Sequence, residues 1–431
     1  MKILLVTMRF GRGCYQGTER YLADLGSALR RRGHEVVYLA GDPDRTRPPA
    51  RLGEQVEADP PVFACPSRGW ACVRGDRADA FAPVLERLAP DVVHLANPAH
   101  IGTGLAEACR RTQIPYVITT MDYWWICPKA TLKHYRGGVC DGNQSWRECL
   151  RCVAADNAHA LTRHSARLPV GVLAALFGIR TLARGMTFDD VRRWFRRDVA
   201  IAECLNGAEH IIFPSAAIES RIRPLLHHER YSHIPHGLDE RWFPPAPAAL
   251  RPRAAAPDRP PVIGFAGTLA RHKAPHLLLE AVRQLGWYDG VLRLAGGTGE
   301  KAYVRRLHEL AKGLRVDFVG VVPPARMPDF LRSLDALVVP SIWPENAPYV
   351  ILEALASGIA VIGSRIGGIP EMIADAARLF EPGSAASLAE ALRRWRESPV
   401  RSAGPPARIL TADEMALRTL QVYEQAAAPS R

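Results

Sequence analysis

Short apolar runs and amphipathic segments alternate along the first half of the chain. The apolar runs are rich in branched residues, as buried strands are, and lie at 2–7, 35–40, 91–95 and 116–119. Between the first two runs, apolar residues recur every three or four positions, which predicts a helix over 18–32 with Thr18 as its N-cap and Gly33 as its stop. Strands that alternate with helices in this way predict a parallel sheet covered on both faces.

The stretch 244–261 interrupts this pattern, because seven of its residues are Pro and six are Ala. Such a composition predicts a linker. The alternation then restarts, with strands predicted at 262–266, 291–295, 316–319, 336–339 and 360–363. The fold class is therefore α/β, with two tandem doubly wound Rossmann-like domains that bind ligands at the carboxyl ends of their strands and face a cleft.

The expected domain limits follow from this reading. The first domain spans 1–243 with an irregular insert at about 121–202, and the second spans 262–398. A further linker and a helix occupy 399–431. That helix opens with the capping-box pattern Thr411-x-x-Glu414, and we expect it to pack back on the first domain.

The net charge of +12 comes mainly from arginine, and no nucleic-acid-binding motif accompanies it, so nucleic acid is not an expected partner. An arginine-rich stretch of the insert contains eight arginines but only three acidic residues, Asp189, Asp190 and Asp198. Two interpretations of this stretch remain open. It can form a solvated helical face, or a basic surface that lies on anionic lipid through the apolar stretch 170–179. The arginines concerned are Arg163, Arg167, Arg180, Arg184, Arg192, Arg193, Arg196 and Arg197.

No segment has the length of a membrane span or the pattern of a signal peptide, since the longest apolar stretch, 168–179, has twelve residues against roughly 18 for a span. We expect a cytoplasmic protein. If the basic surface of the insert binds lipid, we expect the protein to contact the inner membrane face peripherally.

Four cysteines in the insert have the spacing of a tetrahedral metal site. Two of them form a Cys-x2-Cys knuckle, and the set is Cys127, Cys140, Cys149 and Cys152. Structural zinc, unligated or disulfide-bonded thiols, and an iron–sulfur cluster are all compatible with this spacing.

A carboxylate pair follows the strand at 336–339. Glu345 lies on the loop and Glu353 in the helix that Pro348 opens and Gly358 ends. Two such carboxylates can each accept hydroxyl hydrogen bonds, one from a sugar and one from a ribose. Glutamate in a first helical turn is also a common capping choice.

Two further elements belong to the same sheet edge. Lys273 follows the first strand of the second domain, where a cation can reach a diphosphate. Gly367 and Gly368 open the helix after the strand at 360–363, so free backbone N–H groups point toward the same place. Together they predict a site for a diphosphate sugar.

These motifs resemble the retaining family-4 glycosyltransferases, which have the GT-B fold of two Rossmann-like domains. The similarity covers most of the chain and rests on Gly17-Thr18-Glu19, the segment 234–239, Lys273 and the run from Pro340 to Glu371. Residues 121–202 resemble the Cys-rich insert of one subgroup of the family, and we expect this insert to recognise the acceptor.

The resemblance implies roles for particular residues. Glu345 would contact hydroxyls of the donor sugar, Glu353 would hold the nucleotide ribose, and Lys273 would neutralise the diphosphate. Backbone at Gly17 and at Gly367-Gly368 would approach the phosphates, and Asn346 lies in the same run. The implied activity is metal-independent, retaining transfer of a hexosyl group from a UDP- or GDP-sugar to a polysaccharide, glycolipid or natural-product acceptor.

This sequence departs from the family in two places. Thr268 stands where the family usually has an arginine beside the lysine, and Arg271 is the expected substitute. Met121 stands where a histidine is common, so Asp122 becomes the candidate that orients or deprotonates the acceptor hydroxyl. Lys273 and helix N-termini would stabilise the leaving diphosphate, with Glu345 as a positioning group rather than a nucleophile.

Two other classes of function compete with a transferase. A nicotinamide-dependent oxidoreductase would share the opening strand, glycine loop and helix, and Asp42 suits it, but the loop from Gly11 through Gly13 to Gly17 is one residue too long for the fingerprint. A zinc-bearing adaptor on a degenerate enzyme scaffold is the other alternative, which Thr268 and Met121 allow.

Overall fold

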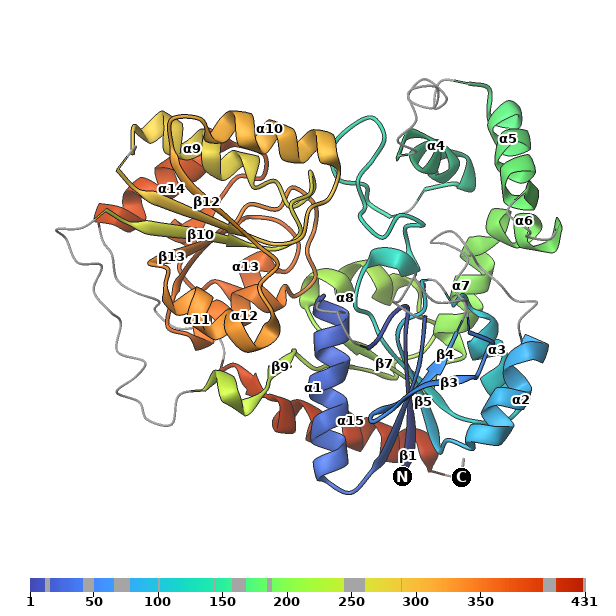
Figure 1. Ribbon diagram of the computed structural model, residues 1–431. Coiled ribbons are helices and arrows are strands. Elements are labelled where there is room, and N and C mark those ends of the chain that lie inside the picture. The colour runs from blue at the N-terminus through green and yellow to red at the C-terminus, as the bar shows by residue number, and fades with distance from the viewer. Residues whose placement is uncertain are drawn as a thin grey trace. The chain divides into compact units, whose positions relative to one another are not determined.

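The computed structural model of the protein divides into two compact α/β units (Figure 1). It describes residues 1–11, 16–41, 50–65, 78–99, 101–142, 144–156, 168–183, 188–243, 260–287, 289–397 and 408–428. The first unit holds Met1–Pro235 and Asp413–Arg431, and the second holds His236–Ala412. The Pro/Ala linker at 244–259, together with Gly13, Asp42, Arg163, Arg167 and Arg184, lies outside the described residues.

The sheet of the first unit has eight strands in the order β3-β4-β2-β1-β5-β6-β7-β8. Every neighbouring pair is parallel except β3 and β4. The strands are β1 (Lys2–Thr7), β2 (Glu35–Ala40), β3 (Gln55–Ala58), β4 (Pro61–Ala64), β5 (Val92–Asn97), β6 (Tyr116–Thr119), β7 (His210–Phe213) and β8 (Tyr231–His233). The four predicted strands of this domain are thus present, and the remaining four were not predicted.

Helices cover both faces of this sheet. One face packs on α2 (Ala78–Leu88) and α3 (Gly104–Arg111) through a large apolar core. The other face carries α1 (Gly17–Arg31) and α15 (Ala412–Ala427), and α8 (Ala216–Ile222) follows β7. Helix α1 begins at Gly17 with Gln16 as its N-cap, two residues before the predicted cap Thr18, and no side chain at that cap accepts a hydrogen bond.

The C-terminal helix α15 joins the first unit through a buried polar network. The ring nitrogens of His94, in β5, lie 2.5 Å from the hydroxyl of Tyr423 and 2.7 Å from that of Thr119. The Tyr21 hydroxyl of α1 lies 3.1 Å from the same Thr119 oxygen. Burial lowers the pKa of His94 to about 3, so this imidazole is neutral and can both donate and accept a hydrogen bond.

The described part of the insert after β6 forms a short 3-10 helix, η1 (Tyr123–Trp125), and then four helices. These are α4 (Trp146–Asp156), α5 (Val170–Ala183), α6 (Phe188–Phe195) and α7 (Arg197–Asn206). A small core of Leu150, Leu173 and Trp194 holds α4, α5 and α6 together. No helix in the described part of the chain is long and apolar enough to cross a bilayer.

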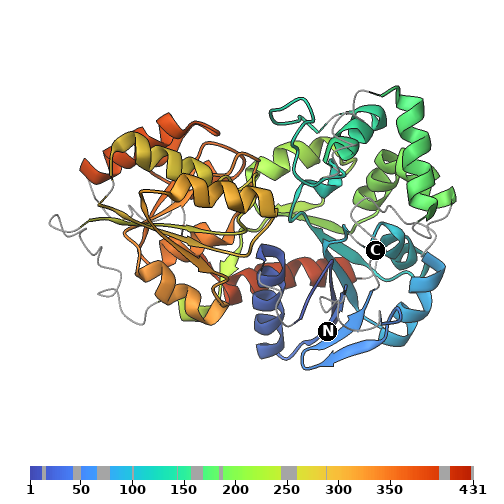
Figure 2. The same ribbon diagram turned by 45° about the horizontal axis from the view of Figure 1, so that its top comes forward.

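The second unit has a six-stranded, fully parallel sheet in the order β12-β11-β10-β13-β14-β15. Its strands are β10 (Val262–Ala266), β11 (Val291–Ala295), β12 (Arg315–Gly320), β13 (Ala336–Val339), β14 (Ala360–Ser364) and β15 (Leu379–Phe380). Both views show α9 (His276–Leu285), α10 (Lys301–Ala311) and α14 (Ala385–Glu397) on one face and α11 (Met327–Arg332) and α12 (Tyr349–Ala356) on the other (Figures 1 and 2). The short α13 (Ile369–Met372) follows β14.

The boundary between the units falls after Pro235, earlier than the predicted limit at 243. The reason is a pair of contacts within the second unit. Strand β9 (Gly237–Leu238) pairs with β16 (Leu410–Thr411), and the His236 ring stacks on Tyr349 with centroids 5.0 Å apart. The segment 234–239 therefore serves partly as an anchor for the second unit.

Candidate functional site

The strand order of the second unit creates a switch point between β10 and β13. Strand β10 has β11 on one side and β13 on the other, so the connections that leave β10 and β13 run to opposite sides. Ligands of doubly wound sheets bind at the carboxyl ends of the strands at such a point. The loop after β10 carries Lys273, and the loop after β13 carries Glu345.

Lys273 and Glu345 meet at this switch point. The Lys273 Nζ donates to Glu345 Oε1 at 2.6 Å, and the same oxygen accepts from Ser341 Oγ at 2.6 Å and from Trp343 Nε1 at 2.9 Å. The Glu345 side chain is 7% exposed and the Lys273 side chain 26%. Three donors, one of them charged, hold this carboxylate in a single position.

The loop that presents Lys273 is tightly turned. Gly267 follows β10 with φ 153°, and Ala274 has φ 50°, which is uncommon for a residue with a side chain. The Lys273 ammonium also lies 5.4 Å from the centroid of the Trp343 ring, within reach of a cation–π contact. Both the backbone and the ring therefore position the lysine side chain.

The glycine pair after β14 supports the backbone of Glu345. The Gly368 N–H donates to the Glu345 carbonyl at 2.8 Å. Gly367 has φ 58°, and a Cβ at that position would lie 2.2 Å from the same carbonyl oxygen. Only glycine fits here, so this pair already has a structural role beside the phosphate contact that the resemblance implies.

Glu353 lies behind this loop, in α12, and is 5% exposed. Asn346 is 7% exposed and precedes the helix. The helix begins at Tyr349 with Pro348 as N-cap, one position later than predicted, and Gly358 follows it with φ 71° as expected of a stop. Glu353 is thus a buried carboxylate in an otherwise apolar helix, and its contact with a nucleotide ribose stays a prediction.

Thr268 and Arg271, which precede Lys273 in the sequence, have different surroundings in the structure. Thr268 is exposed on the loop after β10. Arg271 Nε pairs with Glu300 Oε2 at 2.9 Å, and its guanidinium lies 5.4 Å from the Tyr303 ring centroid. These contacts direct Arg271 toward α10, and its expected partnership with Lys273 stays a prediction.

In the first unit, Asp122 stands at the carboxyl end of β6. Its Oδ1 accepts from the Trp124 backbone N–H at 2.8 Å, which caps η1, and its Oδ2 accepts from Asn97 Nδ2 at 2.8 Å. Burial raises the pKa of Asp122 to about 6, although these two hydrogen bonds and the charge of Arg197 act in the opposite direction. A carboxylate with such a pKa can exchange a proton near neutral pH.

Arg197 faces the same loop. It donates to the Trp124 carbonyl, and its guanidinium lies 4.7 Å from a Trp124 ring centroid. Burial lowers the pKa of Arg197 to about 10, so the side chain remains charged at neutral pH. Gly17, the other predicted residue of this unit, is exposed as the first residue of α1.

Several polar residues of these sites did not emerge from the sequence. Ser341 and Trp343 lie in the motif that identified Glu345, but nothing in the pattern shows that both donate to its carboxylate. Asn97 ends β5 far from Asp122 in sequence. Glu19, in the first turn of α1, is 3% exposed, and burial raises its pKa. The usable signals were the position of Asn97 at a strand's carboxyl end and the place of Glu19, Ser341 and Trp343 within the motifs that carry the resemblance.

The four cysteines of the insert lie close enough for their charges to interact. Burial raises the pKa of Cys149 to about 12, and charges on the other three thiols add to the effect. The Gly142 N–H donates to Cys140 Sγ at 3.4 Å. Within the described ranges, however, no group of three or more His, Cys, Asp or Glu side chains is arranged to hold a metal ion. Zinc at these cysteines stays a prediction.

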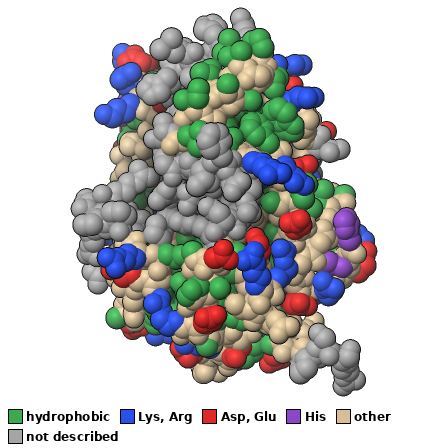
Figure 3. Space-filling model, turned by 90° about the vertical axis from the view of Figure 1, so that its right-hand side faces the viewer, with side chains coloured by type: hydrophobic (Ala, Val, Ile, Leu, Met, Phe, Trp, Pro, Cys, Tyr) green, Lys and Arg blue, Asp and Glu red, His purple; other side chains and the backbone are tan. Residues whose placement is uncertain are grey.

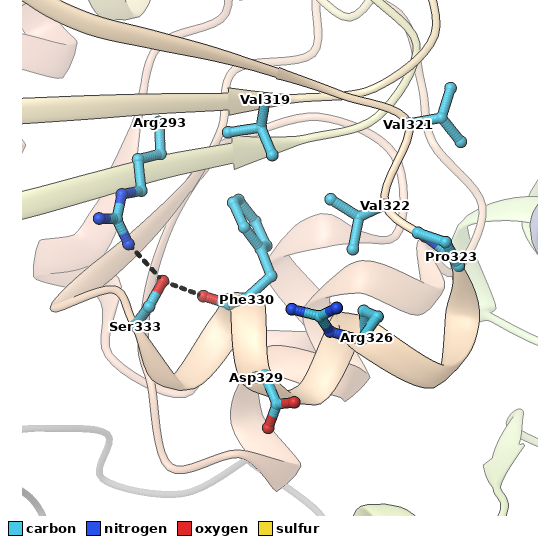
Figure 4. Close-up of a pocket in the computed structure, with 9 residues that line it drawn as sticks. All are labelled: Arg293, Val319, Val321, Val322, Pro323, Arg326, Asp329, Phe330 and Ser333. Carbon is cyan, nitrogen blue, oxygen red and sulfur yellow. Dashed lines mark hydrogen bonds between the residues drawn. The ribbon is translucent and has the colours of Figure 1, made fainter.

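A separate groove of about 420 Å³ lies on the second unit, and none of the predicted donor-binding residues lines it. Figure 4 shows Phe330 of α11 and Ser333, the residue after that helix, on one side, with Arg293 of β11 donating to the Ser333 hydroxyl at 2.8 Å. Val321 and Pro323, after β12, close the other end. The groove is mostly apolar and is distinct in its residues from the Lys273–Glu345 cluster.

The chain matches two protein families. Residues 15–242 match Glycosyltransferase Family 4, and residues 248–407 match Glycosyl transferases group 1. Among curated proteins, D-inositol 3-phosphate glycosyltransferase of Xylanimonas cellulosilytica is 34% identical over 159 residues, which are 34% of this chain and 38% of that protein. Lipopolysaccharide 1,2-N-acetylglucosaminetransferase of Salmonella typhimurium is 30% identical over 198 residues, 43% of this chain and 52% of the relative. The matched region thus spans about half of these relatives or less.

Solved structures share the fold over the whole chain. Sucrose-phosphate synthase from Thermosynechococcus elongatus superposes with a TM-score of 0.66 at 19% identity and covers 100% of both chains. Anabaena HepE in complex with UDP has a TM-score of 0.60 at 18% identity and covers 99% of this chain and 98% of its own. The two parallel α/β sheets are those of the GT-B fold, as the sequence predicted.

Proposed function

Because this chain belongs to Glycosyltransferase Family 4, we propose that it transfers a hexosyl group from a nucleoside-diphosphate sugar to an acceptor hydroxyl. The observation that carries the proposal is the contact of Lys273 with Glu345 at the switch point of the second sheet. A cation and a carboxylate in one place suit a ligand that carries both phosphates and sugar hydroxyls.

Lys273 stabilises the leaving diphosphate in this mechanism. Its ammonium is half-buried and is held by Glu345 and the Trp343 ring. A preorganised cation acts on the negative charge that develops as the glycosidic bond breaks, with little reorganisation in the transition state.

Glu345 positions the donor sugar by accepting hydroxyl hydrogen bonds. Three donors already converge on its Oε1, which lowers the electron density that a covalent nucleophile would need. This geometry favours a positioning role over a glycosyl-enzyme intermediate, with transfer on the same face of the sugar and retention of configuration.

The remaining donor contacts follow from the resemblance. Glu353 binds the nucleotide ribose, and its burial in α12 supports that role. Asn346 and the backbone at Gly367-Gly368 lie on the same sheet edge, with exposed Thr268 on the loop after β10 and Gly17 at the start of α1.

Asp122 orients or deprotonates the acceptor hydroxyl. Its pKa of about 6 leaves it ionised at neutral pH yet basic enough to accept a proton in the transition state. The hydrogen bonds from Asn97 and the Trp124 backbone fix the carboxylate, as a group that must meet one hydroxyl requires.

The donor is a UDP- or GDP-sugar, and HepE, which shares the fold, has been crystallised with UDP. The acceptor is a hydroxyl of a glycan, glycolipid or natural product, and catalysis needs no metal. An oxidoreductase is no longer a candidate, since both family matches are to glycosyltransferases.

A thermal-shift panel of nucleoside diphosphates and their sugars tests the donor class. A true ligand at a hundred times its dissociation constant should stabilise the protein by about 2.7 kcal/mol. Lys273→Ala should lose much of that shift, whereas Arg305→Gln, an exposed position on α10, should keep it. NMR of the product from an α-linked donor should show an α-glycoside, and a β-linked product would refute the retaining mechanism.

A further inference from the structure

Exposed hydrophobic side chains concentrate on the insert of the first unit. Of the eleven large hydrophobic residues that the described ranges leave exposed, seven lie between residues 139 and 199. The most exposed of them are on α5, where Val172 is 45%, Leu176 50% and Ile179 65% exposed. Such a concentration differs from the scattered apolar residues of an ordinary protein surface.

These three residues share one side of α5, because they are spaced four and three positions apart. Leu168, just before the helix, continues the row, and the other exposed residues of this side are Gly171 and Ala175. Among the described side chains, the outer side of α5, defined by Leu168, Val172, Leu176 and Ile179, thus carries none that is charged or polar.

The inner side of α5 is already packed. Leu173 is buried in the small core with Leu150, and the Phe177 ring lies 4.5 Å from that of Trp194. A helix that is apolar on all sides is normally buried, so the outer side of α5 calls for an apolar environment of its own.

Arginine dominates the charged residues of the segment that carries this apolar row. Residues 146–202 contain ten arginines, no lysine and five acidic residues. Arg192, on the adjoining α6, and Arg196 are exposed. Figure 3 shows hydrophobic side chains gathered toward the end where α5 and α6 lie in Figure 1, with Lys and Arg side chains beside them.

We propose that the outer side of α5 and the arginines around it form a docking surface for an anionic lipid bilayer. The twelve apolar residues at 168–179 would span about 18 Å as a helix, well short of a hydrocarbon core of about 30 Å, so the helix lies in the interface rather than across it. Apolar side chains enter the acyl boundary while the guanidinium groups bind lipid phosphates. This surface does not depend on the sugar transfer proposed above.

Sedimentation of the full chain with vesicles tests the proposal without any donor or acceptor. The protein should sediment with vesicles that contain phosphatidylglycerol, bind phosphatidylcholine vesicles far more weakly, and dissociate at high salt. Val172→Ser/Leu176→Ser/Ile179→Ser should reduce partitioning at least about tenfold, because each side chain loses its apolar insertion. Arg192→Gln/Arg196→Gln should reduce the preference for anionic lipid.

Two controls keep the result specific. Leu417→Ser removes an equally exposed leucine, 43% exposed on α15, and should bind vesicles as the unaltered protein does. Thermal unfolding of the triple variant should be unchanged, since the altered side chains are exposed. The proposal would be overturned if the unaltered protein did not bind vesicles. It would also be overturned if the triple variant and the double arginine variant both bound vesicles as strongly as the unaltered protein. Self-association in lipid-free sedimentation velocity that only the triple variant abolishes would likewise overturn it, since this side would then join two copies.

Discussion

Asp122 and Glu345 each follow a strand of one of the two units, but the groups that donate directly to them differ in charge. Each follows a parallel strand at its carboxyl end, and each accepts more than one hydrogen bond. Glu345 has an ammonium group 2.6 Å away, whereas the direct donors to Asp122 are a neutral amide and a backbone N–H. The same fold thus supplies a carboxylate locked to a cation in one unit and a carboxylate near its titration point in the other.

Of the changes that test this difference between the two carboxylates, removal of the Glu345 side chain should have the largest effect, and we expect it in the free energy of unfolding. Glu345→Ala leaves the half-buried Lys273 ammonium without its counter-ion, and we expect a loss of about 3 kcal/mol in the free energy of unfolding. Urea denaturation measures it. Glu345→Gln keeps an oxygen that can accept from Ser341 and Trp343 and should lose less. Equal losses in the two variants would show that the charge contributes little.

Asp122→Asn should lower the transfer rate about 100-fold at neutral pH, because the amide cannot accept a proton. The protein with Asp122 should show a rate that rises with pH through about 6, as the carboxylate ionises, and the variant should lack this limb. The sign for stability is the reverse. Because the folded-state pKa is raised, protonated Asp122 favours the fold at low pH, and that contribution is lost as pH rises through about 6. A pH–rate profile unchanged in Asp122→Asn would assign the carboxylate to the cap of η1 alone.

Lys273→Ala should weaken transition-state stabilisation by about 2 kcal/mol, roughly a 30-fold loss of rate, through loss of a charge-assisted contact with the diphosphate. Calorimetry should show weaker binding of the nucleoside diphosphate. Asp122→Asn is the matched comparison, since it should leave that binding unaltered. If Lys273→Ala bound the nucleotide as tightly as the unaltered protein, the donor site would lie elsewhere.

The cysteines of the insert should affect the second unit least. If they hold zinc, elemental analysis should find about one zinc per chain, and Cys152→Ser should lose it and reduce transfer to the acceptor. Nucleotide binding should not change, because the second unit has its own core. Metal-free protein with full activity would refute zinc at this site, and lost nucleotide binding in Cys152→Ser would show that the insert supports both units.

Sequence patterns were most informative where the physics is local. Branched apolar runs predicted β1, β2, β6, β10, β11 and β13 within a residue, because a buried parallel strand requires such residues at every position. Among the described residues, seven strands of two to four residues were not predicted, because each depends on a partner elsewhere in the chain and so short a segment shows its strand character only when it has three branched residues in a row, as β6 and β13 do. They are β3, β4, β7, β8, β9, β15 and β16.

The sequence by itself determined the fold class, the family resemblance and the presence of the Lys273 cation and the Glu345 carboxylate at one sheet edge, since these depend on period, spacing and strand order. Only the tertiary structure decided which donors meet Glu345, that Arg271 turns to Glu300, and that Asn97 holds Asp122. It also decided that the outer side of α5 faces outward. Hydrogen-bond partners and burial are set by residues far apart in the chain, and a pattern along one segment contains no information about the segment that packs against it.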